Sequence, residues 1–282
     1  MDCKKIKEIY IDKLCDCDAQ IRSDAFDGLL QWMEQNSAKE ALSFETLQVI
    51  SKGLYFCLWM QDKALLQEDL ADKIVLIHDI LKTTDERTTF YFSLLSIINE
   101  KILSLDKWRI DKFLMLVRRI FRHIFNSLAS NNWKETISRK YINMIDTKVL
   151  NRDEEPFKNA MVAHVISIFM DEFDKALNIV PASPDYQLLW YTPFFKSLSN
   201  NKTTDYIFNA ILKDVFQAII ITLEMDCCED TDLEKTKYQI PISDICKELF
   251  NIAKSNSIKS KRRKLLYNMI ENFKIAEKKY VK

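Results

Sequence analysis

The side chains of this sequence that could bind a metal or catalyse a reaction are, first, its three histidines and seven cysteines. No histidine has a cysteine, serine or carboxylate at a spacing typical of a catalytic triad or a metal pair. Cys15 and Cys17 flank an aspartate, and Cys227 precedes Cys228, but zinc is usually bound by four ligands and neither pair has the others nearby. The odd cysteine count and an N-terminus without an apolar leader indicate reduced thiols. We therefore expect structural histidines and no metal, no cofactor and no enzymatic activity.

Basic residues form a more informative pattern. Within 107–129 the apolar residues occupy one half of the helical wheel, and the other half carries Arg109, Lys112, Arg118, Arg119 and Arg122. An arginine-rich helical face suits phosphate, because each guanidinium can pair with two oxygens at once. The same face could instead be a solvated surface that pairs with acidic residues of a neighbouring helix.

The C-terminal end is a second basic element. Residues 254–282 contain ten Lys or Arg and two Glu, a net charge of +8, so residues 1–253 carry −8 of the overall zero. The run at 259–264 includes Lys261, Arg262, Arg263 and Lys264. A basic end on an acidic body favours a polyanion or an acidic protein surface as partner. Such a run is also typical of a nuclear localisation signal or of the charged start of a helix.

These residues must be positioned by helices. Only two Gly and five Pro occur in 282 residues, which argues against all-β folds and excludes glycine-rich phosphate loops. Apolar residues recur at steps of three and four along almost the whole chain, which is the period of an α-helix. The predicted helices cover 3–14, 19–35, 44–60, 63–82, 86–104, 107–129, 132–150, 157–178, 186–199, 203–225, 242–254 and 260–279.

Many amphipathic helices joined by short loops leave two architectures, a globular bundle or a solenoid of stacked antiparallel helix pairs. Successive pairs span about 35–45 residues, the size of a HEAT-type repeat. We expect an all-α fold of stacked antiparallel helix pairs, a HEAT- or armadillo-like α-solenoid, as one continuous domain over 1–253. Residues 254–282 should form a basic C-terminal helix that packs on this domain or extends from it.

The segment 53–63 predicts a tight helical hairpin. Glycine inside a helix costs about 1 kcal/mol relative to alanine, so we expect Gly53 to permit a close helix contact. Trp59 is the expected core anchor of the hairpin. Helix N-caps, whose side chains accept orphan amide hydrogens, are predicted at Asp18, Ser43, Asp62, Asp85, Asp106 and Thr203.

Four ordered segments also resemble a known family. The first is G-L-Y-F-C-L-W-M-Q-D-K at 53–63, which contains Tyr55, followed by L-Q-E-D-L at 66–70. The others are 105–119 with Trp108, the segment 163–173, and 193–198 beginning at Pro193. Together they resemble the eukaryotic nucleolar ribosomal RNA processing protein 1 family, with its Nop52-type domain, over roughly residues 1–225. One departure is Ser167, where the family pattern has an acidic residue.

The resemblance implies an all-α domain that acts in nucleolar pre-rRNA processing and ribosomal subunit assembly without enzyme activity. It implies pre-ribosomal particle proteins as partners, with pre-rRNA as a further candidate, and neither a small-molecule substrate nor a membrane. We expect a scaffold whose contacts come from the 109–122 face or the 259–264 run. Two alternatives stay open. One is a helical-repeat adapter for transport or signalling peptides with no RNA role, and the other is an unrecognised enzyme with a deep polar pocket.

Overall fold

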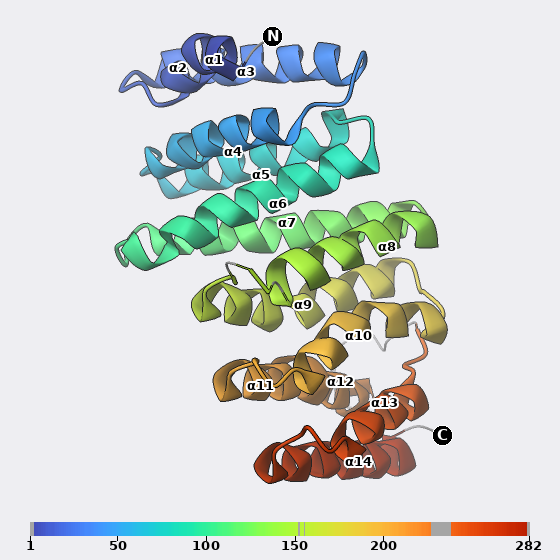
Figure 1. Cartoon of the computed structure of the whole chain (residues 1–282). Coiled ribbons are helices and arrows are strands. Elements are labelled where there is room, and N and C mark those ends of the chain that lie inside the picture. The colour runs from blue at the N-terminus through green and yellow to red at the C-terminus, as the bar shows by residue number, and fades with distance from the viewer. Residues whose placement is uncertain (1–2, 152, 155, 227–237, 281–282) are drawn as a thin grey trace. The chain divides into compact units, whose positions relative to one another are not determined.

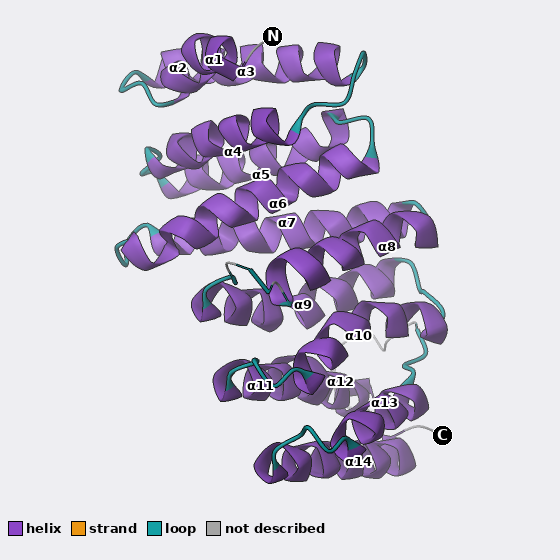
Figure 2. Ribbon diagram, viewed as in Figure 1, coloured by secondary structure: helices purple, strands orange, loops and turns teal. Residues whose placement is uncertain are grey.

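The computed structural model describes residues 3–151, 153–154, 156–226 and 238–280, and every regular element within these ranges is a helix (Figures 1 and 2). The chain divides into two compact units, Met1–His123 and Ile124–Lys282. The long helix α7 (Ile110–Ser130) begins in the first unit and ends in the second.

The first unit is built from an N-terminal helix and four longer ones. Its elements are α1 (Cys3–Ile6), the π-helical turn η1 (Lys7–Ile11), α2 (Asp12–Leu14), α3 (Ala19–Ser37), α4 (Phe44–Trp59), α5 (Ala64–Ile80), α6 (Thr84–Lys101), the 3₁₀ turn η2 (Ile102–Ser104) and the start of α7. Helices two apart in the chain pack on one another: α3 contacts α5, and α4 lies along α6. This pattern is typical of stacked helix pairs.

The second unit continues in the same manner. Its elements are α8 (Glu135–Met144), the π-helical η3 (Ile145–Leu150), α9 (Asn159–Ile179), α10 (Pro184–Ser199), α11 (Asp205–Ile211), the π-helical η4 (Leu212–Gln217), α12 (Ala218–Asp226), α13 (Ile242–Lys254) and α14 (Ser260–Tyr280). Here α8 contacts α10, α9 contacts α11, and α14 packs on α12 and α13. Aromatic rings form the core, in which Phe125, Phe169, Phe173 and Trp190 lie in mutual contact.

The predicted all-α helical-repeat fold is confirmed. Each predicted helix is present among the described residues, and its ends differ from the prediction by no more than three residues. The period of the apolar residues is therefore a sufficient signal for these elements. The predicted division of the chain between residues 253 and 254 stays a prediction.

Two of the predicted N-caps are confirmed, and a third predicted cap accepts from the turn that precedes α7. The Oδ1 atom of Asp18 accepts from the amide of Gln20 at 2.7 Å, and Ser43 Oγ accepts from the amide of Thr46 at 3.2 Å. Asp106 Oδ1 accepts from the amides of residues 108 and 109 at 2.9 and 3.0 Å, just ahead of α7.

The other three predicted caps are wrong by one or two residues. At α6 the cap is a threonine because it forms a capping box, in which Thr83 Oγ1 accepts from the amide of Glu86 and the Glu86 carboxylate accepts from the amide of Thr83. Asp85 lies inside the first turn of that helix. In place of Asp62, Asp85 and Thr203, the observed N-caps are Lys63, Thr83 and Thr204.

The stretch Asp205–Met225 is long and apolar enough to cross a membrane by length and composition alone. Half of its most apolar window is buried within the protein. Its elements pack against α9, α10 and α14 of the same unit, which is the environment of a core helix.

The cysteines that the structure describes are free thiols, as expected; they are Cys3, Cys15, Cys17, Cys57 and Cys246. Burial raises the pKa of the Cys57 thiol to about 11, so this group is a neutral packing residue at physiological pH. Cys227 and Cys228, with most of the acidic loop that follows α12, lie outside the described residues.

Candidate nucleic-acid interface

The basic face of α7 is partly neutralised by its neighbour α5. Arg119 forms an ion pair with Glu68, at 3.0 Å between Nη2 and Oε2, and a second with Asp72. Its side chain is only 15% exposed. For Arg119 the structure therefore favours pairing with acidic residues of a neighbouring helix over an open phosphate site.

Lys112 is not available as a surface contact, which corrects the sequence-based expectation. It is buried, and its Nζ donates to the carbonyl oxygens of Trp59 at 2.7 Å and Gln61 at 2.8 Å. These carbonyls lie at the C-terminal end of α4, where the helix dipole favours a cation. Burial lowers the pKa of the Lys112 ammonium. The residue therefore ties α7 to the end of α4.

The remaining basic residues of α7 differ in their exposure. Arg109 lies over the ring of Trp59, with its guanidinium carbon 4.3 Å from the ring centroid, and pairs with Asp106. Arg118 is half-buried, whereas Arg122 is exposed. Among the five basic residues predicted for contact on this helix, Arg122 is the one most open to a partner.

In the C-terminal basic run, one arginine is part of the core. Arg262 is 5% exposed and donates from Nε and Nη2 to Asp205 Oδ1, at 2.8 and 2.6 Å. Nη2 also donates to the carbonyl of Thr203 at 2.5 Å, and the guanidinium lies 4.8 Å from the Phe208 ring centroid. Hydrogen bonding and the charge of Arg262 lower the pKa of Asp205. Arg262 joins the start of α14 to the start of α11. Like Lys112, it is therefore not available to contact a nucleic acid or an acidic partner.

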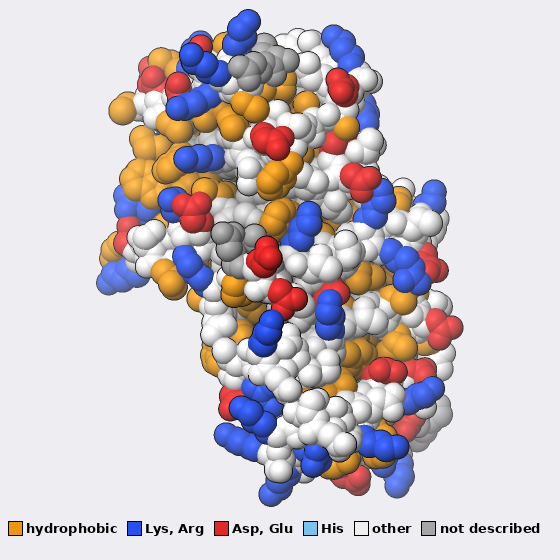
Figure 3. Space-filling view, in the orientation of Figure 1, with side chains coloured by type: hydrophobic (Ala, Val, Ile, Leu, Met, Phe, Trp, Pro, Cys, Tyr) orange, Lys and Arg blue, Asp and Glu red, His pale blue; other side chains and the backbone are white. Residues whose placement is uncertain are grey.

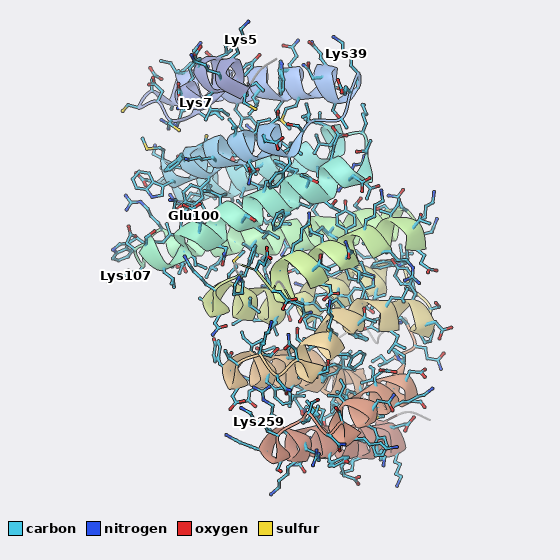
Figure 4. The ribbon with its side chains drawn as sticks, viewed as in Figure 1. Lys5, Lys7, Lys39, Glu100, Lys107 and Lys259 are labelled. Atoms are coloured by element: carbon cyan, nitrogen blue, oxygen red, sulfur yellow. The ribbon has the colours of Figure 1, made fainter. Side chains whose placement is uncertain are left out.

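Arg263 closes the turn between α13 and α14. It donates to the carbonyls of Ala253, Ser255 and Ile258 at 2.9, 3.0 and 3.2 Å. The lysines of the run, Lys259, Lys261 and Lys264, are exposed, and Lys259 extends away from the chain ahead of α14 (Figure 4). The arginines of this run thus stabilise the fold, while its lysines face the solvent.

The 53–63 hairpin brings α4 close to the N-terminal helix. Gly53 is buried, and a Cβ atom there would lie 2.8 Å from two carbons of Ile11, so the predicted close contact is confirmed. Tyr55 is buried and stacks on Phe113 with centroids 4.4 Å apart. Trp59 is half-buried under Arg109, so it covers the end of the hairpin where a core anchor was expected.

Trp108, which belongs to the motif at 105–119 and precedes α7, is 79% exposed. Lys107 places its Nζ 4.7 Å from the Trp108 ring centroid, and Figure 4 shows Lys107 at the outer end of the first unit. In Figure 3 hydrophobic and basic side chains lie side by side on this unit. An exposed aromatic ring beside cations is suited to stacking on a nucleobase or to packing against a protein.

Pro193 lies inside α10 and is buried. Proline has no amide hydrogen, so the carbonyl of Leu189 loses its regular helical donor. The Thr192 hydroxyl donates to that carbonyl at 2.6 Å, and the Pro193 carbonyl accepts from Asn151 Nδ2 at 3.0 Å. The motif residue therefore has a structural role in joining α10 to the end of η3.

The sequence analysis missed one cluster, formed by His78, Asp79 and His123. The histidines lie 45 residues apart on α5 and α7, so a search for ligand spacing along the chain could not find them. His78 and His123 lie in different helix pairs of the predicted fold, so no pattern in the sequence placed them together.

Stacked amphipathic helix pairs, with structural arginines and an exposed set of lysines, define an all-α helical-repeat protein. The family model described as the nucleolar protein Nop52 matches residues 6–274. The chain belongs to the Nop52 family.

Relatives of known name agree with this assignment. A ribosomal RNA processing protein 1 homolog of Caenorhabditis elegans is 29% identical over 276 residues, which are 97% of this chain and 68% of that protein. The human homolog B is 29% identical over 81% of this chain and 30% of its own length. The Drosophila melanogaster homolog is 35% identical over 46% of this chain and 19% of its own length. The chain thus corresponds to about two thirds of the worm protein and to less than a third of the human and fly proteins.

Proposed function

We propose that this protein is a non-enzymatic nucleolar scaffold in ribosomal RNA processing and ribosome biogenesis, and that it joins pre-ribosomal particles through exposed basic residues. The observation that supports this function is the Nop52 match across residues 6–274, together with relatives named as ribosomal RNA processing proteins. Stacked helix pairs support the scaffold role, because they present an extended surface to several partners at once.

The contact residues that we propose are the lysines at the start of α14 and Arg122 on α7. Lys259 directly precedes α14, and Lys261 and Lys264 lie at its start; all three are exposed, and lysine is a compact cation suited to phosphate. Arg122 is the most exposed basic residue of the α7 face. Lys112 and Arg262 are excluded from this set because both are buried and hydrogen-bonded within the fold.

The experiment is a tagged purification from the native cell after ultraviolet crosslinking, with sequencing of the attached RNA. The wild-type chain should recover pre-ribosomal proteins and crosslinked pre-rRNA. The triple variant Lys259→Glu, Lys261→Glu, Lys264→Glu should lose most of the crosslinked RNA while remaining folded. A matched control reverses three exposed lysines of the N-terminal helix, Lys4, Lys5 and Lys7, and should behave as the wild type.

Arg122→Glu tests the α7 face separately. Arg119 is unsuitable for charge reversal, because a glutamate there would face Glu68 and Asp72 and destabilise α5 and α7. Pre-ribosomal proteins without crosslinked RNA would mean that the protein bridges other proteins and contradict the RNA contact. Recovery of neither would contradict the proposed function and favour the transport or signalling adapter.

A further inference from the structure

Three side chains with ligand atoms converge at the end of α5 in the first unit. His78 Nδ1 lies 2.7 Å from Asp79 Oδ1. His123 Nε2, on α7, lies 3.1 Å from the same oxygen and 3.2 Å from His78 Nδ1. Two ring nitrogens and one carboxylate oxygen thus face one another across a very small space.

Protons or a metal cation can hold these atoms together. With one proton on His78 Nδ1 and one on His123 Nε2, both imidazoles donate to the Asp79 carboxylate, but the two ring nitrogens then face each other as donors at 3.2 Å. Protons thus satisfy the two contacts with the carboxylate and leave the contact between the ring nitrogens unmet. A metal cation satisfies all three together, since each atom is an ordinary metal ligand.

The surroundings hold the ligand atoms in place before any ion arrives. The side chain of His78 is fully buried and stacks on Tyr91, with centroids 5.1 Å apart and planes at 15°. Tyr91 is itself fixed by its hydroxyl, which donates to the Val75 carbonyl at 3.1 Å. The Asp79 side chain is 54% exposed, which leaves a route for an ion and room for water as a further ligand.

We propose that His78, Asp79 and His123 bind one divalent transition-metal ion of the zinc type, with water completing its coordination. Zinc bonds to nitrogen and oxygen ligands are about 2.0–2.2 Å long, so tetrahedral ligand atoms lie about 3.3–3.5 Å apart. The two contacts of His123 nearly match this spacing, and the exposed Asp79 carboxylate has to move away from His78 by about 0.6–0.8 Å. Imidazole nitrogens with one carboxylate favour zinc, copper, nickel or iron over magnesium or calcium.

The ion would connect two helices that are distant in sequence. Asp79 and His123 are separated by 44 residues, and one shared ligand set would tie the end of α5 to the middle of α7. Binding only to the folded state stabilises that state, so the ion should raise the melting temperature of the protein.

The test uses the full chain, freed of metal by a chelator and titrated with Zn²⁺ by calorimetry and with Co²⁺ by absorption. One equivalent should bind, with visible d–d bands and without the near-ultraviolet sulfur-to-cobalt band that cysteine ligands produce. His123→Gln and Asp79→Ala should each weaken binding at least about tenfold. Both sites are partly exposed, so these variants should stay folded, which circular dichroism checks.

His164→Gln is the matched control, because it removes the remaining imidazole of the chain at a residue on α9. It should bind the ion as the wild type does. The proposal is overturned if the wild type shows no saturable binding, if the sulfur-to-cobalt band appears, or if His123→Gln binds Co²⁺ as tightly as the wild type. This test needs no ribosomal partner, so its failure leaves the proposed function untouched.

Discussion

At the scale of single residues, Gly53 shows how one missing side chain sets a helix contact. A Cβ atom at this position would lie 2.8 Å from Ile11 Cδ1 and Cγ2 and 3.3 Å from Leu14 Cδ1. Contacts that short do not occur without movement, so α4 approaches the N-terminal helix closely only because residue 53 is glycine.

We predict that Gly53→Ala lowers the free energy of unfolding by about 1–2 kcal/mol. Alanine gains about 1 kcal/mol of helix propensity, but overpacking costs about 1–3 kcal/mol, and the second effect should win in this buried contact. Urea denaturation measures the difference. The matched control is Gly28→Ala, whose Cβ would meet the end of the Tyr10 ring at 3.2 Å and should be neutral or stabilising. An equally stable Gly53→Ala protein would show that the helices can separate at little cost.

His78 makes stability depend on pH. Burial lowers its pKa to about 4; the nearby His123 and Arg87 act in the same direction, while Asp79 opposes them. The unfolded chain therefore binds this proton first, near the ordinary value of 6.5. The contribution of the neutral His78 imidazole to the free energy of unfolding should be fully present above pH 6.5 and should decrease as the pH drops toward 4.

The expected loss is about 1–3 kcal/mol across that window, measured as the midpoint of urea unfolding in the presence of a chelator. The variant His78→Gln should be less stable at neutral pH, and its stability should change less between pH 4 and pH 6.5. His164→Gln should keep the wild-type slope. A wild-type profile as flat as that of His78→Gln would mean that the imidazole is charged in the folded protein.

At the scale of elements, Glu86 organises the connection between α3 and α6. It is 3% exposed, and its carboxylate accepts from Ser37 Oγ at 3.0 Å and from the Leu42 amide at 2.8 Å, besides the capping contacts with Thr83. Burial by itself would raise the pKa of Glu86, but these hydrogen bonds outweigh it and lower the pKa. One carboxylate thus fixes the loop after α3 and the first turn of α6.

We predict that Glu86→Gln destabilises the first unit by about 1–3 kcal/mol, because a buried charged acceptor of several hydrogen bonds is lost. Amide hydrogen exchange at Leu42 and Thr83 should become faster, since their acceptor is weakened. Glu45→Gln is the control, at an exposed position in the first turn of α4. If Leu42 exchanges equally fast in both variants, the Glu86 contact does not hold the loop.

The arginines of the C-terminal run also belong to this scale. Arg262 and Arg263 hold α14 against α11 and close its connection to α13. A substitution of either residue would therefore disturb the fold and any binding together. Only substitutions of the lysines in this run can change binding without also changing the stability of the fold.

At the scale of the whole molecule, charge is distributed unevenly, with −8 over residues 1–253 and +8 over 254–282. The basic end can attract a polyanion that the rest of the chain repels. Association with RNA should therefore weaken as the salt concentration rises.

We predict that binding to a single-stranded pre-rRNA spacer transcript shows a salt dependence that shrinks in the triple variant of Lys259, Lys261 and Lys264. If each lysine neutralises one phosphate, the slope of log K against log salt should fall by about 2. Fluorescence anisotropy at several salt concentrations measures it. The triple variant of Lys4, Lys5 and Lys7 should keep the wild-type slope, and equal slopes for all three proteins would place the contact elsewhere.

Local sequence patterns were enough to predict the helices and the class of fold. Apolar residues at steps of three and four mark each helix because the burial of one face is a local property of the pattern. The caps at Asp18 and Ser43 and the close contact at Gly53 followed from the same local physics. The family followed from four ordered motifs, and the match over residues 6–274 confirms it.

Which polar residues are buried in contacts within the fold, and which are exposed to a partner, depends on how the helices pack. Lys112 and Trp59 are 53 residues apart, Arg262 and Asp205 are 57 apart, and the two histidines of the proposed metal site are 45 apart. Lys112 falls on the polar half of the helical wheel of 107–129. Its partner is supplied by a different helix, so burial and pairing depend on how the helices pack. That is why the sequence could indicate a basic face but could not separate its structural cations from those that meet the solvent.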